Sequence, residues 1–201
     1  RFGLFVMPDL NEQYVSRLVI LLEKVSKYYG NHEPVLSYVS QPPLNGGLIL
    51  EAHTYTPDKG DHITYKHIGT FPYVVLVNGS GRFLFAGGFH GDVINFGIEQ
   101  QSKEVFKLVS ELLRKEGFPI NSIIRQWNYI EQITKFDGED QHYQIFNNAR
   151  SDYYAMTTWE NGYPAATGIG TNLGGILVEH YAAVFSNPYC DATPIDKTLQ
   201  V

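Results

Sequence analysis

The chain has 201 residues, a length that fits one domain or two small ones. Hydrophobic residues make up 43% of it and charged residues only 18%, a composition that excludes a disordered chain. The net charge of -6, without any run of basic residues, argues against a nucleic-acid partner, and the longest strongly apolar run, Leu18 to Leu22, is too short to span a membrane.

The first predicted element is a helix over Asn11–Tyr29. Apolar residues recur there every three or four positions, and Gly30 supplies a left-handed stop. Asp9 and Glu12 have the spacing of a capping box at its start. Short runs rich in β-branched and aromatic residues follow, and they predict strands at residues 34–39, 47–55, 62–68, 73–77 and 82–86, with a hairpin turn at 78–81.

The second half of the chain alternates helices and strands. A helix is predicted at residues 98–116, with Gly117 as its stop, and another at 140–156. Alternating side chains predict strands at 121–132 and 175–185. Strands that alternate with helices at this spacing predict an α+β domain with helices stacked on one face of a sheet.

The sequence shows no spacing typical of a metal site. It contains seven His and one Cys, but no two His stand four residues apart on a predicted helix and no His-x-His pair lies on a predicted strand. We therefore expect neither a metal nor a cofactor. The single Cys190 cannot form an internal disulfide, which favours a cytoplasmic location.

A glycine-rich stretch runs from Thr167 to Gly175. A dinucleotide site needs a strand before such a stretch and a helix after it, but here a predicted strand follows. We interpret it as a turn with close backbone approach. The alternative is an anion site formed by the backbone amides of Thr167, Gly168 and Gly170.

Two arginines, Arg125 and Arg150, lie among apolar and aromatic residues. Arginine in such surroundings suits bidentate recognition of a carboxylate, and neighbouring aromatic rings would sandwich a planar organic acid. The alternative is that both arginines tie strand and helix together through internal ion pairs.

Several motifs between Arg82 and Phe185 match those of a known family. They are residues 83–88, the helix from Ile98, Tyr143-x-x-Phe146-Asn147, residues 163–167 and residues 177–179. In these the chain resembles the RidA family, also called YjgF. The resemblance implies an α+β fold, a RidA-like (chorismate-mutase-like) mixed sheet with two helices on one face, here preceded by an N-terminal α+β segment. It also implies a homotrimer or a pseudo-trimeric packing, with sites at the clefts.

One position departs from the RidA pattern. In that family a Pro-Ala-Arg-Thr motif supplies the arginine that holds the substrate carboxylate, whereas this chain has Ala166 at the corresponding position. Loss of that guanidinium removes a charge-assisted contact of about 3 kcal/mol if it is buried. The departure argues against imine deaminase activity, although Glu179 matches the family's strand glutamate.

Three ordered motifs are closer to those of another family. They are Arg125-Gln126-Trp127-Asn128-Tyr129-Ile130, the helix from Tyr143 to Arg150, and the loop at residues 164–170. In these the chain resembles the chorismatases, most of whose catalytic apparatus lies in a second RidA-like unit. The resemblance implies an N-terminal segment at residues 1–77, a RidA-like unit at 78–186, and a linker at 187–201 that leads to that second unit.

We therefore hypothesise that the chain is the N-terminal RidA-like portion of a chorismatase-like enzyme and that this portion is inactive by itself. The complete enzyme would cleave the enolpyruvyl ether of chorismate by general acid catalysis. Glu179 is the one catalytic candidate. The substrate-binding candidates are Arg150, Tyr143, Arg125, Trp127, Thr167, Gly168 and Gly170.

Among these candidates, Arg150 and Tyr143 are expected to reach the substrate, whereas Arg125 and Trp127 are expected to support the fold. The first alternative is a noncatalytic module that binds a small organic acid through the Thr167 to Gly170 amides and a neighbouring arginine. The second alternative is a remnant imine or enamine deaminase that uses Glu179.

Overall fold

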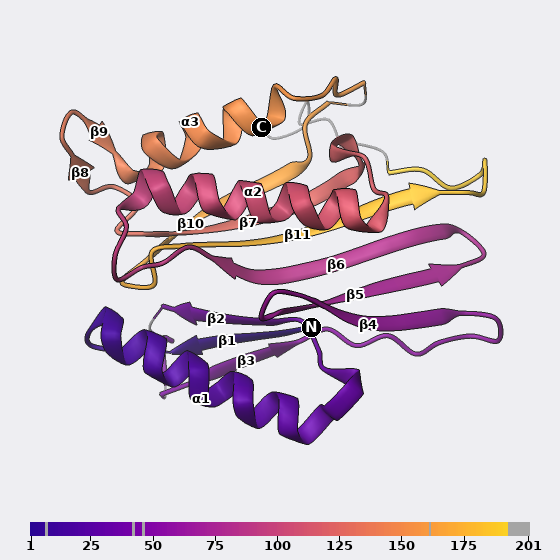
Figure 1. Cartoon of the computed structure of the whole chain (residues 1–201), viewed down its shortest axis with the longest axis horizontal. Helices are drawn as coiled ribbons and strands as arrows, with labels where there is room; N and C mark the ends of the chain where they lie inside the picture. The colour runs from indigo at the N-terminus through magenta and orange to yellow at the C-terminus, as the bar shows by residue number, and fades with distance from the viewer. Residues whose placement is uncertain (7, 42, 46, 161, 193–201) are drawn as a thin grey trace.

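The computed structural model describes residues 1–6, 8–41, 43–45, 47–160 and 162–192 (Figure 1). Its helices are α1 (Asn11–Tyr29), α2 (Ile98–Glu116) and α3 (His142–Tyr154), with short 3-10 helices at Gly30–His32 and Ile120–Ser122. Its strands are β1 (Phe2–Val6), β2 (Leu36–Ser40), β3 (Ile49–Ala52), β4 (His62–Ile68), β5 (Phe71–Asn78), β6 (Gly81–His90), β7 (Ile123–Glu131), β8 (Phe136–Asp137), β9 (Asp140–Gln141), β10 (Ala165–Thr171) and β11 (Ile176–Phe185). Within the described residues, no helix combines the length and the apolar character that crossing a membrane requires.

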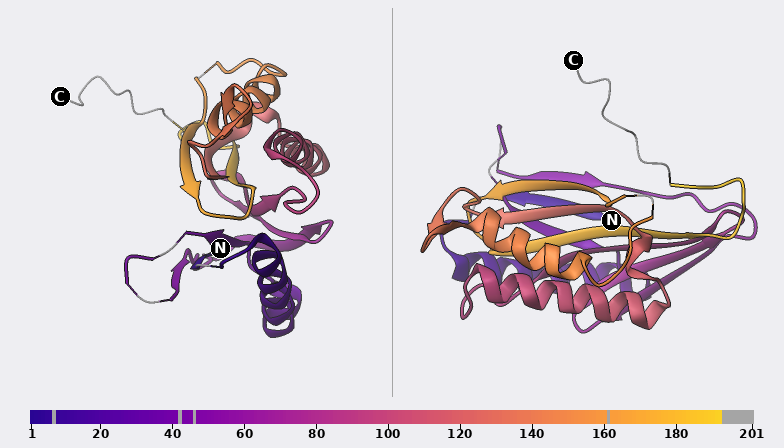
Figure 2. Two further views of the ribbon diagram at one scale, coloured as in Figure 1. Left: turned by 90° about the vertical axis from the view of Figure 1, so that its left-hand side faces the viewer. Right: turned by 90° about the horizontal axis from the view of Figure 1, so that it is seen from above.

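Within the described part of the chain, six strands form one sheet in the order β10-β7-β11-β6-β5-β4, here called the central sheet. β10 and β7 run parallel, and every other pair of neighbours runs antiparallel. Figure 2 shows α2 and α3 together on one side of this sheet. A mixed sheet with two helices on one face is the predicted fold class, which is therefore confirmed.

The helix face of the central sheet carries the main apolar core. Val105, Val109 and Leu112 of α2 follow the helical spacing and are buried against the sheet. Phe146 of α3 joins the same core and is fully buried. Each large apolar side chain buried in this way stabilises the fold by about 1.5–3 kcal/mol. Gly117, with a left-handed φ of 67°, ends α2 as predicted.

The opposite face of the central sheet packs against a smaller unit (Figures 1 and 2). Within the described residues, three strands in the order β2-β1-β3 form a second sheet, here called the N-terminal sheet, and α1 covers its outer side. All five residues of β2 are buried, because this strand lies between α1 and the central sheet. Phe5 and Val39 pack against Tyr129 and Leu177 of the central sheet.

Two glycines of β6 let the two sheets approach each other closely. Gly88 has a φ of 69°, and a Cβ atom there would lie 2.1 Å from the carbonyl oxygen of Leu36. A Cβ atom on Gly87 would lie 2.9 Å from Ser37 Oγ and 3.1 Å from Glu179 Cγ. A side chain at either position would push β2 away from the central sheet.

The helix predicted at Asn11–Tyr29 is confirmed, but its predicted capping box is wrong. Leu10 precedes the helix and makes no side-chain cap. The backbone N–H of Asp9 donates to Oε1 of Gln13 at 3.1 Å, so Gln13 takes the part that the prediction gave to Glu12.

The glycine-rich stretch was expected to form a turn, and that expectation is wrong for its first half. Residues 165–171 form β10, which pairs with β7 residue by residue. A Cβ atom on Gly168 would lie 3.3 Å from Tyr143 Cε2, and one on Gly170 would lie 2.7 Å from Ile133 Cγ2. The two glycines therefore allow the side chains of Tyr143 and Ile133 to lie directly against the backbone of β10.

The expected boundary at residues 77 and 78 falls within a continuous part of the central sheet. β4 precedes the boundary and pairs with β5, which contains it and continues into β6 through a hairpin between Asn78 and Gly81. Three consecutive antiparallel strands keep this region in one sheet. Residues 193–201 of the expected linker lie outside the described residues.

Candidate functional site

The face of the central sheet that turns toward the N-terminal sheet gathers four of the predicted site residues. Trp127 of β7 stands opposite Glu179 of β11 on one side and opposite Thr167 of β10 on the other. Residues opposite each other on paired strands point to the same face and lie about 5 Å apart. Arg125, two residues before Trp127, shares that face. The fold therefore brings Arg125, Trp127, Thr167 and Glu179 together.

Glu179 is fully buried between the two sheets, where Arg1 forms an ion pair with its Oε2 atom. The Arg1 side chain is itself only 5% exposed. The second carboxylate oxygen, Oε1, has no hydrogen-bond partner among the described residues. Because an isolated charge at such depth is strongly destabilising, each member of the pair requires the other.

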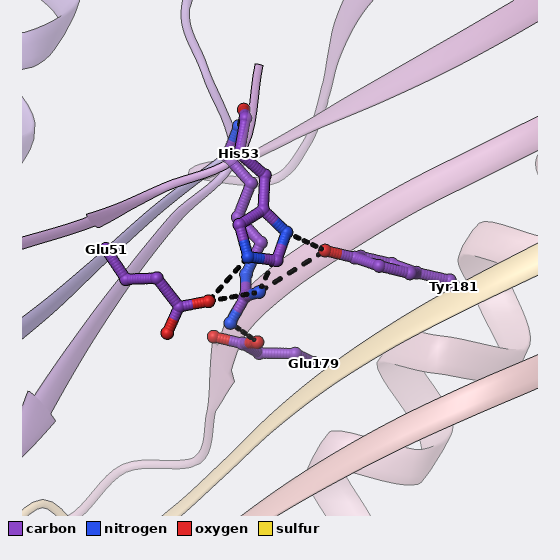
Figure 3. A network of polar contacts seen from close by, with 5 residues as sticks. Glu51, His53, Glu179 and Tyr181 are labelled. Atoms are coloured by element: carbon purple, nitrogen blue, oxygen red, sulfur yellow. Dashed lines mark hydrogen bonds and ion pairs between the residues drawn. The ribbon is translucent and has the colours of Figure 1, made fainter. Parts of the chain in front are cut away.

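Toward solvent the pair continues into a polar network with Tyr181, His53 and Glu51 (Figure 3). The Arg1 Nη1 atom donates to the Tyr181 hydroxyl at 3.3 Å and lies 3.6 Å from Glu51 Oε1. His53 joins the other two, with Nδ1 3.1 Å from the Tyr181 hydroxyl and Nε2 2.5 Å from Glu51 Oε1. The N-terminal segment thus supplies Arg1, Glu51 and His53, and β11 supplies the rest.

The protonation of this network is governed by burial. Burial raises the pKa of the Glu179 carboxyl, while the positive charge of Arg1 opposes the shift. Burial likewise raises the pKa of the Tyr181 phenol, again against the effect of Arg1. A raised carboxyl pKa is typical of a general acid. Here, however, the N-terminal sheet covers the Glu179 carboxyl and Arg1 is paired with one of its oxygens. The ion pair therefore joins the two sheets.

Two guanidinium groups lie near the ring of Trp127. The Cζ atoms of Arg1 and Arg125 lie 5.1 and 4.7 Å from the centroid of its ring, within cation–π range. The Tyr181 ring meets Trp127 edge-on at 4.9 Å. Arg125 donates to Thr167 Oγ1 and forms no ion pair with any described residue. The half-buried Arg125 therefore has N–H donors free for an anion.

Arg150 and Tyr143 lie on α3, on the other side of the central sheet. Arg150 donates to Asn147 Oδ1, lies 5.9 Å from the Tyr154 ring centroid and has no ion pair among the described residues. Tyr143, 40% exposed, lies against β10 at Gly168. The fold does not bring these two residues to the group around Trp127, and their part in substrate binding stays a prediction.

The interpretation of Arg125 and Arg150 as internal ion-pair residues is wrong for the described part of the chain. Their partners are a threonine hydroxyl and an amide oxygen rather than carboxylates. An anion site at the backbone amides of Thr167, Gly168 and Gly170 stays a prediction. The described residues contain no group of three or more His, Cys, Asp or Glu positioned to hold a metal ion.

Sequence reasoning missed Arg1, Glu51, His53 and Tyr181. A weak signal was present, because Glu51 and His53 stand two residues apart in a predicted strand, as do Glu179 and Tyr181. Polar pairs on one face of otherwise apolar strands mark a face that meets other polar groups. Nothing in the sequence indicated that these two strands face each other across two sheets.

Comparison with known proteins relates the chain to one family. The family model described as chorismatase FkbO/Hyg5-like, N-terminal, matches residues 70–182, which run from the turn between β4 and β5 into β11. The 3-hydroxybenzoate synthase of Streptomyces hygroscopicus is 29% identical over 119 residues, which are 58% of this chain and 30% of that protein. The chain therefore spans less than a third of that relative's length.

Similar chain traces occur among solved structures. A crystal structure of a chorismatase gives a TM-score of 0.45 at 19% identity and covers 74% of this chain and 42% of that chain. A member of the YjgF/YER057c/UK114 family from Mycobacterium tuberculosis gives a TM-score of 0.42 at 13% identity and covers 55% of this chain and 84% of that chain. These likenesses carry no argument about function.

Proposed function

Because the chain belongs to the FkbO/Hyg5-like chorismatase family, through that family's N-terminal domain, we propose that it is the N-terminal portion of a chorismatase-like enzyme that acts on chorismate. The reaction is cleavage of the enolpyruvyl ether. A general acid protonates the methylene carbon of the enolpyruvyl group. Addition of water then breaks the ether and gives pyruvate and a dihydroxycyclohexadiene acid, whereas loss of pyruvate with arene formation, without added water, gives a hydroxybenzoate. We place the protein in the cytoplasm, in a homotrimeric or pseudo-trimeric packing.

The buried ion pair of Glu179 with Arg1 is the observation that supports a noncatalytic role for this portion. A general acid must lie within hydrogen-bond reach of the carbon that it protonates. Glu179 is fully buried behind the N-terminal sheet and held by Arg1. The acid for ether cleavage is therefore proposed to come from outside this chain, which by itself does not turn over chorismate.

A second candidate function is the noncatalytic binding of small carboxylates, and it is favoured by the state of Arg125. This guanidinium is half-buried, stacked on Trp127 and without a carboxylate partner among the described residues. A guanidinium held in this way can bind a carboxylate through two parallel hydrogen bonds.

The test incubates the protein, as its gene encodes it, with chorismate and follows pyruvate by coupled NADH oxidation with lactate dehydrogenase. The enzyme proposal predicts one pyruvate for each chorismate consumed. If chorismate is not consumed and 3-hydroxybenzoate raises the Tm, the enzyme proposal is wrong and the protein is a noncatalytic carboxylate-binding module. The Arg125→Gln variant should lose that rise in Tm, whereas Arg114→Gln, at an exposed arginine of α2, should keep it.

A further inference from the structure

A separate cavity lies at the end of the central sheet where β11 ends, on the right in Figure 1. Its volume is about 240 Å³. A water molecule in the liquid takes up roughly 30 Å³, so the cavity has room for a compact organic ligand. Its walls come from the α2–β7 connection, the α3–β10 connection and β11, namely Pro119, Asn121, Ser122, Trp159, Glu160, Gly162, Ala183 and Val184.

Three side-chain donor groups in the described part of these walls already make hydrogen bonds within the fold. The Asn121 Nδ2 atom donates to the carbonyl of Thr158 at 3.1 Å, which ties the two connections together. The Ser122 hydroxyl donates to the carbonyl of Pro119 at 2.6 Å. The Trp159 Nε1 atom donates to the carbonyl of Tyr154 at 2.9 Å, which fixes the indole ring. These bonds fix the walls of the cavity, and they leave one N–H of the Asn121 amide as the side-chain donor of the described walls that a ligand could use.

Two acceptor groups of the described walls also remain. The Glu160 carboxylate forms no ion pair with a described residue, and the Asn121 Oδ1 atom accepts no hydrogen bond from one. The lining contains neither Lys nor Arg. The fixed indole of Trp159 adds an aromatic ring, which attracts cations through its negative face. A carboxylate, an amide oxygen and an indole ring together suit a positively charged donor.

We infer that this cavity binds a compact organic cation, a guanidinium or a protonated amine, with Glu160 as its counter-ion and Trp159 as its aromatic wall. The site is independent of the group around Trp127, because it uses none of those residues. An anionic ligand is disfavoured there, since the Glu160 carboxylate would repel it without any basic residue to compensate.

The test is an NMR titration of the protein with methylguanidinium, which follows the indole N–H signal of Trp159. That signal is assigned with the Trp159→Phe variant. N-methylurea serves as the neutral probe of similar shape, and acetate as the anionic probe. We expect a saturable shift with methylguanidinium and none with the other two.

Matched glutamate variants test the counter-ion. Glu160→Gln should weaken methylguanidinium binding about tenfold, the effect of losing a charge-assisted contact. Glu139→Gln, at an exposed glutamate between β8 and β9, should leave the binding unchanged. The inference is overturned if methylguanidinium gives no saturable shift, if N-methylurea shifts the signal equally, or if Glu160→Gln binds as the unaltered protein does.

Discussion

The two faces of the central sheet are built on different principles. The face beneath α2 and α3 is filled by a large apolar cluster in which Val109, Leu112 and Phe146 are fully buried. The face beneath the N-terminal sheet has a smaller apolar cluster and a buried ion pair, Arg1 with Glu179. Apolar packing stabilises without directional demands, whereas a buried charge requires one partner in one place. The helix face thus stabilises the fold, and the other face holds the groups capable of recognition.

The largest expected effect is on the helix face. Phe146→Ala should lower the free energy of unfolding by about 3–5 kcal/mol, because a fully buried ring leaves a cavity. Phe5→Ala, a half-buried ring between the sheets, should lower it by only about 1–2 kcal/mol. Urea unfolding of both variants measures the difference. Equal losses would mean that the two faces contribute alike.

The ion pair should give the next largest effect. Arg1→Met leaves the Glu179 carboxylate buried without a partner and should lower the free energy of unfolding by about 3 kcal/mol at pH 7. Combining it with Glu179→Leu should recover most of that loss, because the double variant leaves neither charge buried. A single variant as stable as the unaltered protein, measured by the same urea unfolding, would mean that the pair does not fasten the sheets.

His180 is a titratable residue on the helix face, and it is fully buried with neither ring nitrogen hydrogen-bonded among the described residues. Burial lowers the pKa of His180 to about 4 from its usual 6.5. Between about pH 6.5 and pH 4 the imidazole is protonated in the unfolded chain but neutral in the folded chain. The free energy of unfolding therefore falls as the pH falls through that range.

From pH 7 to pH 5 the shift corresponds to about 2 kcal/mol. The unaltered protein should therefore lose about 2 kcal/mol more than His180→Leu over that interval, which urea unfolding at both pH values measures. Parallel losses in the two proteins would show that His180 is protonated or exposed in the folded state.

The smallest effect should come from the solvent end of the polar network. The Glu51 side chain is 47% exposed, so its contacts with His53 and Arg1 are screened by water. Glu51→Gln should lower the free energy of unfolding by less than about 1 kcal/mol. A loss as large as that of Arg1→Met would show that Glu51 contributes to stability like a buried member of the ion pair, which would contradict its exposure to solvent.

The sequence predicted those parts of the fold that local patterns determine. The bounds of α1 and α2 were predicted correctly, because amphipathic spacing and a following glycine are both local signals. β10 was missed, since Gly168 and Gly170 have low strand propensity and their place depends on pairing with β7. β1 was missed as well, because five apolar residues show no period of their own.

The candidate site was predictable only in part. Arg125, Trp127, Thr167 and Glu179 were singled out from motifs, and pairing of neighbouring strands brings them together. Arg1 was missed, because its contact with Glu179 joins residues 178 apart across two sheets. Contacts of that kind depend on how the two sheets pack, which hydrophobic spacing does not encode.

Chorismate turnover by the Glu179→Gln variant of the protein, as its gene encodes it, tests the central claim most directly. Measured per folded molecule, pyruvate release should stay within about threefold of the unaltered protein, because Glu179 is the ion-pair partner of Arg1 and not the general acid. A loss of about a hundredfold or more, the size expected when a general acid is removed, would contradict it.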